Sequence, residues 1–283
     1  MQADQAMRDN DTNHNPTRRA MMRGTAALAL AGLGVPSARA ANSSKLYLQQ
    51  GKDPTFAELV ENGTIVVGKQ STKGVKGSTI RVNRDRIERG PTGRNPIPKD
   101  IRIHTLCHSH IKRGDFPKWT RWYQEDGKTQ IFRLFEGEHN CRNKRPDAGR
   151  IEAYSALKWK KSEKWHGWEG TYTIIKPHGC MIFQVKNNEN DWGVSIAMND
   201  QGDIKLNHRR GQEDRIIAKQ MVEKPFVLKL IDNGHDYRVY LNRKKVGEGM
   251  YDRPKGETGF RWGMYGKTFR HDAMLFVTGA RFE

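Results

Sequence analysis

The chain has 283 residues, and 50 Lys and Arg against 32 Asp and Glu give it a formal net charge of +18. A chain of this length suits one or two domains with a large core, which excludes the small classes that fold only with disulfides or metal ions. The charge predicts a polyanionic partner, which can be nucleic acid, a membrane surface or an acidic polysaccharide.

Residues 1–40 have the pattern of an export signal. Thr17-Arg18-Arg19 precedes the apolar run Ala20–Val35, and Ala38-Arg39-Ala40 offers a small-x-small cleavage site. The paired arginines predict the twin-arginine route, and the apolar run is too short and too rich in Ala and Gly to span a membrane. Removing this signal leaves a charge near +16. We therefore expect a periplasmic or secreted monomer that binds an anionic polysaccharide rather than nucleic acid.

The mature chain, residues 41–283, reads as a single all-β domain. Its first part predicts one short helix, Pro54–Asn62, and the strands Thr64–Val67, Ser78–Val82 and Ile101–His104. From Thr129 onward the pattern predicts ten strands: Gln130–Phe135, Arg150–Trp159, Gly170–Lys176, Cys180–Asn187, Trp192–Met198, Asp203–His208, Phe226–Ile231, Tyr237–Leu241, Gly259–Tyr265 and Ala273–Phe282. Many antiparallel strands with almost no helix predict a β-jelly-roll sandwich of two antiparallel sheets. Residues 41–128 are either part of the sandwich or an accessory layer.

Cysteines and histidines suggest no standard metal site. Cys107, Cys141 and Cys180 allow at most one internal disulfide, and the sequence does not choose the pair. His104, His108 and His110 beside Cys107 fit no zinc spacing, so we expect solvated or packed loop histidines and no metal cofactor. A structural calcium ion in the Asp- and Asn-rich turn at 187–191 is the alternative to a solvated turn there.

Three of the predicted strands carry long polar side chains on the face opposite their apolar residues. Period-2 alternation groups the following residues: Arg261, Gly263 and Tyr265 on the last, Arg150, Glu152 and Tyr154 on the first, and Gln184 and Lys186 on the second. If these strands line one concave sheet, they form a basic groove with Glu152 holding the arginines. The alternative is an exposed sheet face with cross-strand ion pairs.

The order and spacing of these residues resemble the concanavalin A-like jelly-roll polysaccharide lyases, which include alginate lyases and glucuronan lyases. The family-seven alginate lyase motifs read RTELR, QIH and YFKAGVYNQ. Arg150 and Glu152 match the first motif, Gln184 matches the second, and Phe260, Gly263 and Tyr265 match the third. The resemblance covers residues 129–283. It departs from the motifs at Tyr154, which replaces an arginine, at Lys186, which replaces the histidine, and at Arg261, which replaces a lysine.

The resemblance implies a lyase that cleaves a uronate polymer by β-elimination and leaves an unsaturated end. Arg150 and Gln184 are then expected to bind the carboxylate, with Glu152 orienting Arg150 and with Lys186 or Arg261 adding positive charge. Tyr265 is the expected proton-transfer group, and cationic neighbours have to assist it because the reference pKa of tyrosine is about 10. In mannuronate and glucuronate the C5 hydrogen and the C4 oxygen lie on the same side, so one such residue suffices. Loss of the QIH histidine therefore favours mannuronate-type alginate or glucuronan.

Other residues and functions stay open at this stage. His139 and His208 are alternative bases, His208 and Arg210 can extend an anion-binding surface, and Trp119, Trp122, Trp165 and Trp168 can either stack on sugars or pack in the core. One rival function is a glycoside hydrolase that uses Glu136 and Glu138. A second rival is a non-catalytic, lectin-like carbohydrate-binding protein with the same groove.

Overall fold

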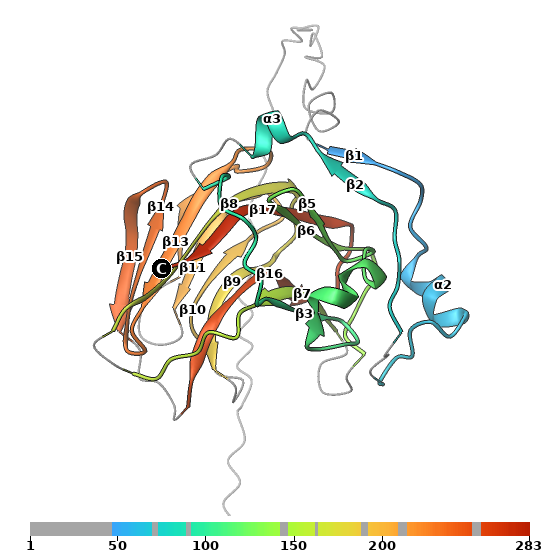
Figure 1. The fold of residues 1–283 in the computed structure, drawn as a ribbon, viewed down its shortest axis with the longest axis horizontal. Coiled ribbons are helices and arrows are strands. Elements are labelled where there is room, and N and C mark those ends of the chain that lie inside the picture. Colours follow the sequence, from blue (N-terminus) through green and yellow to red (C-terminus); the bar gives the residue numbers. More distant parts are fainter. Residues whose placement is uncertain are drawn as a thin grey trace, which may run out of the picture. The chain divides into compact units, whose positions relative to one another are not determined.

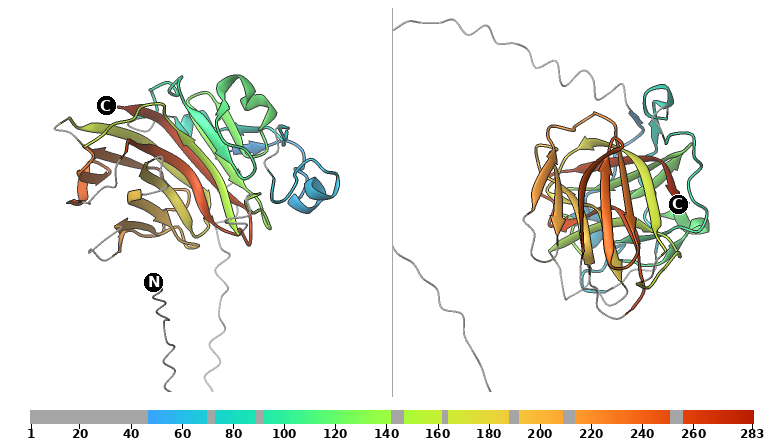
Figure 2. Two further views of the ribbon diagram at one scale, coloured as in Figure 1. Left: turned by 90° about the horizontal axis from the view of Figure 1, so that it is seen from below. Right: turned by 90° about the vertical axis from the view of Figure 1, so that its left-hand side faces the viewer.

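The computed structural model describes residues 47–69, 73–88, 92–141, 147–161, 164–187, 192–208, 214–250 and 256–283. Residues 38–283 form one compact unit built from two large β-sheets (Figures 1 and 2). The strands within each sheet pair antiparallel, as expected for a jelly-roll sandwich. The expected export signal lies outside the described residues.

The eight-stranded sheet has the spatial order β12 (Arg215–Ala218), β11 (Ile204–His208), β10 (Trp192–Met198), β9 (Cys180–Asn187), β16 (Thr258–Lys267), β7 (Ala148–Tyr154), β3 (Arg102–Thr105) and β4 (Ile111–Lys112). The seven-stranded sheet has the order β15 (Lys244–Met250), β14 (Asp236–Leu241), β13 (Phe226–Asp232), β8 (His166–Lys176), β17 (Ala273–Phe282), β6 (Thr129–Leu134) and β5 (Tyr123–Asp126). A small sheet pairs β1 (Tyr47–Gln49) with β2 (Ile80–Val82), and the helices are α2 (Phe56–Glu61), α3 (Arg84–Ile87) and the 3-10 helix η1 (Arg113–Lys118).

The predicted elements agree with the structure at most positions, and the bounds of β9, β10 and β17 are those expected from the sequence. The helix α2 has a capping box, because Thr55 Oγ1 accepts the Glu58 N–H and the Glu58 carboxylate accepts the Thr55 N–H. The strand predicted at 64–67 is wrong. Asn62 Oδ1 accepts the N–H of Thr64 at 3.0 Å, and this turn replaces strand pairing.

Aromatic side chains fill the space between the two sheets. Trp168 of the seven-stranded sheet packs against Phe183 and Trp262 of the eight-stranded sheet, with ring centroids 4.9 and 5.5 Å apart. Trp119, Trp122 and Trp168 are at most 4% exposed. Of the two alternatives that the sequence left open, core packing therefore holds for these three tryptophans.

The segment before residue 129 belongs to the sandwich. Its strands β3 and β4 extend the eight-stranded sheet and β5 extends the seven-stranded sheet (Figure 1). Two buried ion pairs hold it in place, Arg133 Nη1 with Asp53 Oδ2 at 2.9 Å and Arg121 Nη2 with Glu138 Oε1 at 3.0 Å. We call these four residues the anchor cluster.

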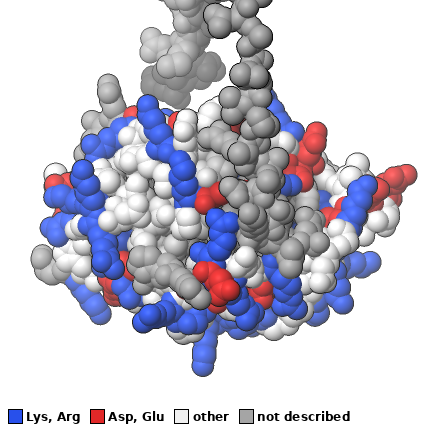
Figure 3. All heavy atoms as spheres, turned by 90° about the horizontal axis from the view of Figure 1, so that it is seen from above, with Lys and Arg blue, Asp and Glu red and all other residues white. Residues whose placement is uncertain are grey.

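The surface is basic, and Lys and Arg side chains outnumber acidic ones on the face shown in Figure 3. Within the described ranges, no helix is long and apolar enough to cross a membrane.

Candidate active site

The strand β16 lies between β7 and β9 and sets the position of most predicted site residues. In its register Arg261 is opposite both Tyr154 and Gln184, and Tyr265 is opposite Arg150. Because the neighbouring Trp262 faces the other sheet, these polar side chains lie on the outer face. The structure therefore brings together Arg150, Glu152, Tyr154, Gln184, Lys186, Arg261 and Tyr265, which we call the polar row.

Glu152 is the centre of the polar row. Its Oε2 lies 3.3 Å from Arg150 Nε, and its Oε1 accepts a hydrogen bond from Gln184 Nε2. The guanidinium of Arg150 stacks on the ring of Tyr265, 4.1 Å from the ring centroid. All four side chains are less than a tenth exposed, so their contacts hold them in one arrangement.

The other end of the polar row gathers positive charge around Tyr154. Arg261 stacks over the Tyr154 ring at 5.3 Å, and Lys158 Nζ lies 6.0 Å from the same centroid. Burial lowers the pKa of Lys158 to about 8, with Arg261 adding to the shift and Glu257 opposing it. Burial also lowers the pKa of Arg261, whose Nε has no hydrogen-bond partner among the described residues. Lys158 was not among the residues that the sequence suggested.

Gly263, which alternation groups with Arg261 and Tyr265, does not open space for a ligand on this face. It has φ +123° and sits at a register shift between β16 and β9. A Cβ at this position would lie 2.3 Å from the Ile151 carbonyl oxygen and 2.9 Å from the Phe132 ring. The backbone thus requires glycine here for its conformation and its close packing.

Two histidines from the β3–β4 region border the polar row, although the sequence placed them in a loop. His104 is opposite Glu152 in the β3–β7 register, and its Nε2 lies 3.3 Å from Arg150 Nη1. His110 has φ +64°, and its Nδ1 bonds the Tyr154 hydroxyl. Alternation along Arg102–Thr105 would have predicted the position of His104. No local signal would have predicted His110.

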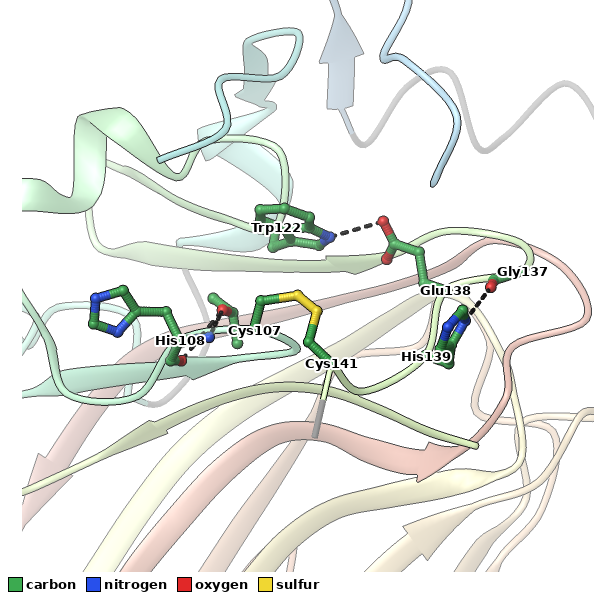
Figure 4. The surroundings of a disulfide bond; sticks show 8 residues. Cys107, His108, Trp122, Gly137, Glu138, His139 and Cys141 are labelled. Carbon is green, nitrogen blue, oxygen red and sulfur yellow. Dashed lines mark hydrogen bonds between the residues drawn. A yellow bond between two sulfur atoms is a disulfide. The ribbon is translucent and has the colours of Figure 1, made fainter. Parts of the chain in front are cut away.

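A disulfide ties the β3–β4 turn to the segment after β6. It joins Cys107 to Cys141 (Figure 4). The third cysteine, Cys180, is a buried free thiol. The bond removes Cys107 as a thiolate ligand for the neighbouring histidines. It also holds the turn that carries His110 against the body of the sandwich.

Two other predicted site residues, His139 and His208, lie apart from the polar row. His139 packs on Phe56 with ring centroids 4.7 Å apart, and its Nδ1 lies 3.1 Å from the Gly137 carbonyl oxygen (Figure 4). His208 bonds Tyr237 of the other sheet, because alternation places it on the core side with Ile204 and Leu206. Arg210 and most of the proposed calcium turn, residues 188–191, lie outside the described residues.

The paired acids of the rival hydrolase are not a catalytic pair. The strand β6 ends at Leu134, so Glu136 is exposed while Glu138 is buried. Glu138 accepts a hydrogen bond from Trp122 Nε1 at 2.8 Å (Figure 4). It also accepts from Arg121 Nε at 3.0 Å and from Phe135 N at 2.9 Å. Burial raises the pKa of Glu138 to about 6, against the opposing effect of Arg121. Its burial and these contacts show that Glu138 has a structural role.

The polar row has the charge of an anion-binding site. Three of its members are cationic, Lys158 lies beside them, and Glu152 is the one carboxylate that the described residues contribute to the row. A carboxylate-bearing ligand would offset this excess of positive charge through charge-assisted hydrogen bonds. The phenol of Tyr265 lies next to Arg150, where it could exchange a proton with such a ligand.

Comparison with solved structures supports the jelly-roll fold. No protein-family model and no curated protein sequence matches the chain. Among solved structures, alginate lyase AlgAT5 from polysaccharide lyase family 7 is similar with a TM-score of 0.53 and 13% identity, over 65% of this chain and 94% of that one. The alginate lyase from Corynebacterium sp. has a TM-score of 0.55 and 10% identity, with the same coverage of 65% and 94%.

A third structure is similar over a larger share of this chain. The marine family-7 alginate lyase AlyA1 from Zobellia galactanivorans matches with a TM-score of 0.50 and 11% identity, over 84% of this chain and 94% of its own. At such identities the comparison shows architecture and not substrate. The chain therefore has a jelly-roll fold that resembles that of the polysaccharide lyases.

Proposed function

We propose that this chain is a polysaccharide lyase that cleaves a uronate polymer by β-elimination. The observation that carries the proposal is the convergence of Arg150, Glu152 and Gln184 beside Tyr265 on one sheet face. The likeness of the fold to alginate lyases adds support. The proposal includes export, and a disulfide within the fold suits an oxidising compartment outside the cytoplasm.

In the proposed reaction, Arg150 and the second amide hydrogen of Gln184 bind the C5 carboxylate of the sugar. This matters because removal of the C5 proton builds negative charge next to an existing anion. A preorganised donor aimed at such charge is worth about 3–4 kcal/mol in well-studied enzymes. Glu152 contacts both Arg150 and Gln184, so it holds the two donors in place before the substrate arrives.

Tyr265 then removes the C5 proton, and the electron pair of the C5–H bond forms the C4–C5 double bond as the C4–O bond breaks. The departing C4 oxygen takes a proton, which the same tyrosine returns when both groups lie on one side of the ring. Lys186 stands where the family-seven motif has its histidine. We therefore propose mannuronate-type alginate or glucuronan as substrate in preference to guluronate.

The test is ultraviolet absorbance after the mature protein is mixed with polymannuronate, polyguluronate and glucuronan in separate reactions. Elimination creates a conjugated double bond that absorbs, whereas hydrolysis does not. We expect absorbance to rise with polymannuronate or glucuronan. A rise with polyguluronate alone would contradict the proposed substrate, and no rise with any polymer would contradict the lyase.

A variant separates the lyase from a lectin-like binding protein. Tyr265→Phe removes one hydroxyl, and we expect at least a hundredfold loss of cleavage with nearly unchanged polymer affinity. Tyr240→Phe on β14 of the other sheet is the matched control and should keep full activity. If Tyr265→Phe cleaves as fast as the unaltered protein, another group carries the proton.

A further inference from the structure

Three turns at one end of the sandwich bring together two histidines and a carboxylate that are not members of the polar row. His178 lies between β8 and β9, Asp200 between β10 and β11, and His271 between β16 and β17. One potential ligand atom from each residue lies within 4.8 Å of the other two. These residues are far apart in the sequence, so no spacing motif predicts that they lie together.

The distances between the potential ligand atoms suit one metal ion if these atoms move slightly closer together. His271 Nε2 lies 3.9 Å from Asp200 Oδ1, and the two imidazole ring centroids lie 4.7 Å apart. Bonds of about 2.1 Å from zinc to nitrogen or oxygen place neighbouring ligands of a tetrahedral site about 3.4 Å apart. The exposed Asp200 and His271 can move this far, whereas His178 is buried.

Hydrogen bonds hold both rings in the tautomer that a metal requires. His271 Nδ1 lies 3.2 Å from the Asp272 carbonyl oxygen, which can only accept, so Nδ1 carries the proton and Nε2 has a lone pair. The Arg270 N–H donates to His178 Nε2 at 3.2 Å, so the lone pair of that nitrogen is occupied by a bond that an ion has to displace. Because Arg270 lies in an exposed turn, water can replace this bond when an ion binds.

Neighbouring groups position the Asp200 carboxylate and leave one side of the cluster open to solvent. Asp200 Oδ1 accepts the Gly179 N–H at 2.7 Å, which aims the carboxylate at the rings. The Asp272 carboxylate is not available as a further ligand, because it accepts hydrogen bonds from Lys176 Nζ at 3.3 Å and from the Glu136 N–H at 3.1 Å. A cavity of about 500 Å³ borders Asp200 and His271, so water or a small anion can complete the coordination.

We propose that His178, Asp200 and His271 bind a divalent transition-metal ion, with Zn²⁺ as the expected occupant. Two imidazole nitrogens and one carboxylate oxygen favour zinc-like ions over Ca²⁺ or Mg²⁺, which prefer oxygen ligands. The ion would join turns from both sheets, since β8 and β17 belong to one and β9, β10, β11 and β16 to the other. This site does not depend on the proposed lyase activity.

The experiment is a titration of the untagged, chelator-treated mature protein with Zn²⁺ alone, followed by calorimetry and by thermal unfolding. We expect saturable binding of one ion, and a rise in Tm of about 5–10 °C when free zinc exceeds Kd a hundredfold. Ca²⁺ should cause no comparable rise. Co²⁺ should give the visible absorption bands of a nitrogen- and oxygen-ligated ion.

Two exposed substitutions test the ligands without disturbing the core. His271→Ala and Asp200→Asn should each weaken zinc binding at least tenfold, and Asn at 200 keeps an acceptor for the Gly179 N–H. The control is His235→Ala, because His235 and Asp236 form a half-buried pair 3.1 Å apart to which the described residues add no third ligand. The proposal is overturned if zinc does not bind saturably, or if it binds both ligand variants as tightly as the unaltered protein.

Discussion

The anchor cluster and the polar row are both buried groups of charged side chains, and they differ in charge balance. The anchor cluster sets two guanidinium groups, Arg121 and Arg133, against two carboxylates, Asp53 and Glu138. The polar row and the adjacent Lys158 set four cations against Glu152, among the residues that the structure describes. The first group pairs its cations with an equal number of carboxylates, whereas the second has an excess of positive charge.

This difference shows how to separate structural charges from functional ones in a fold. Arg133 also donates to the carbonyl oxygens of Ser78 and Thr120, so its bonds join distant segments of the chain. Arg261 instead contacts the ring of Tyr154, although its pKa, like that of Arg133, is lowered by burial and by a neighbouring guanidinium. Burying excess charge costs stability, and proteins retain it where a ligand needs it.

The largest expected effect comes from breaking the anchor cluster. Glu138→Ala leaves Arg121 buried without its carboxylate, and we expect a loss of about 3–5 kcal/mol in the free energy of unfolding. Denaturant unfolding measures it, with the exposed Glu136→Ala as control. A loss below about 1 kcal/mol would show that the cluster does not hold the N-terminal segment.

Removing a cation from the polar row should act in the opposite sense on stability. Arg261→Met keeps the length of the side chain and removes the excess charge, so unfolding free energy should stay level or rise while cleavage falls about a hundredfold. Arg133→Met is the matched variant in the anchor cluster and should lose stability. Equal destabilisation by both substitutions would abolish the distinction between the two groups.

A smaller effect is expected from the histidine that bonds Tyr154. His110→Ala leaves the buried hydroxyl of Tyr154 without its imidazole partner, which should cost about 1–3 kcal/mol and slow cleavage severalfold. His108→Ala is the control on the same turn, because its Nδ1 lies 2.6 Å from the Ser109 carbonyl oxygen. Identical cleavage rates in the two variants would place His110 outside the site.

The smallest expected effect is the pH dependence due to Lys158. Its pKa of about 8 means that its charge is lost as pH rises through 8, so polymer affinity should fall about fivefold there. Stability should change in the opposite direction. The folded pKa lies below the unfolded value of 10.5, so the cost of burying this charge disappears as pH rises from 8 toward 10.5. Lys158→Arg should bind polymer independently of pH in this range.

Alternation along single strands predicted much of the fold and most of the polar row. Phe183 and Trp262 identified the core faces of β9 and β16, which fixed the opposite positions of Gln184 and Arg261. The same rule predicts that His208 points inward with Leu206, so the interpretation of His208 as a surface residue was an avoidable error.

Residues that depend on tertiary packing could not be found in this way. Lys158 and His110 reach Tyr154 from irregular segments, and the ligands of the proposed zinc site come from three separate turns. A sequence read strand by strand contains no signal for contacts of this kind. The turn conformation of Gly263 was likewise hidden, because an alternating pattern does not reveal a bulge.

The disulfide has a consequence for the order of events during biogenesis. Three cysteines allow three pairings in an unfolded chain, but in the folded sandwich Cys180 is enclosed in β9 and only Cys107 and Cys141 can meet. If the chain folds before its cysteines are oxidised, only the Cys107–Cys141 disulfide can therefore form. A route that delivers the chain already folded to an oxidising compartment would produce a single oxidised species without an isomerase, whereas oxidation of the unfolded chain would leave mispaired molecules to be repaired.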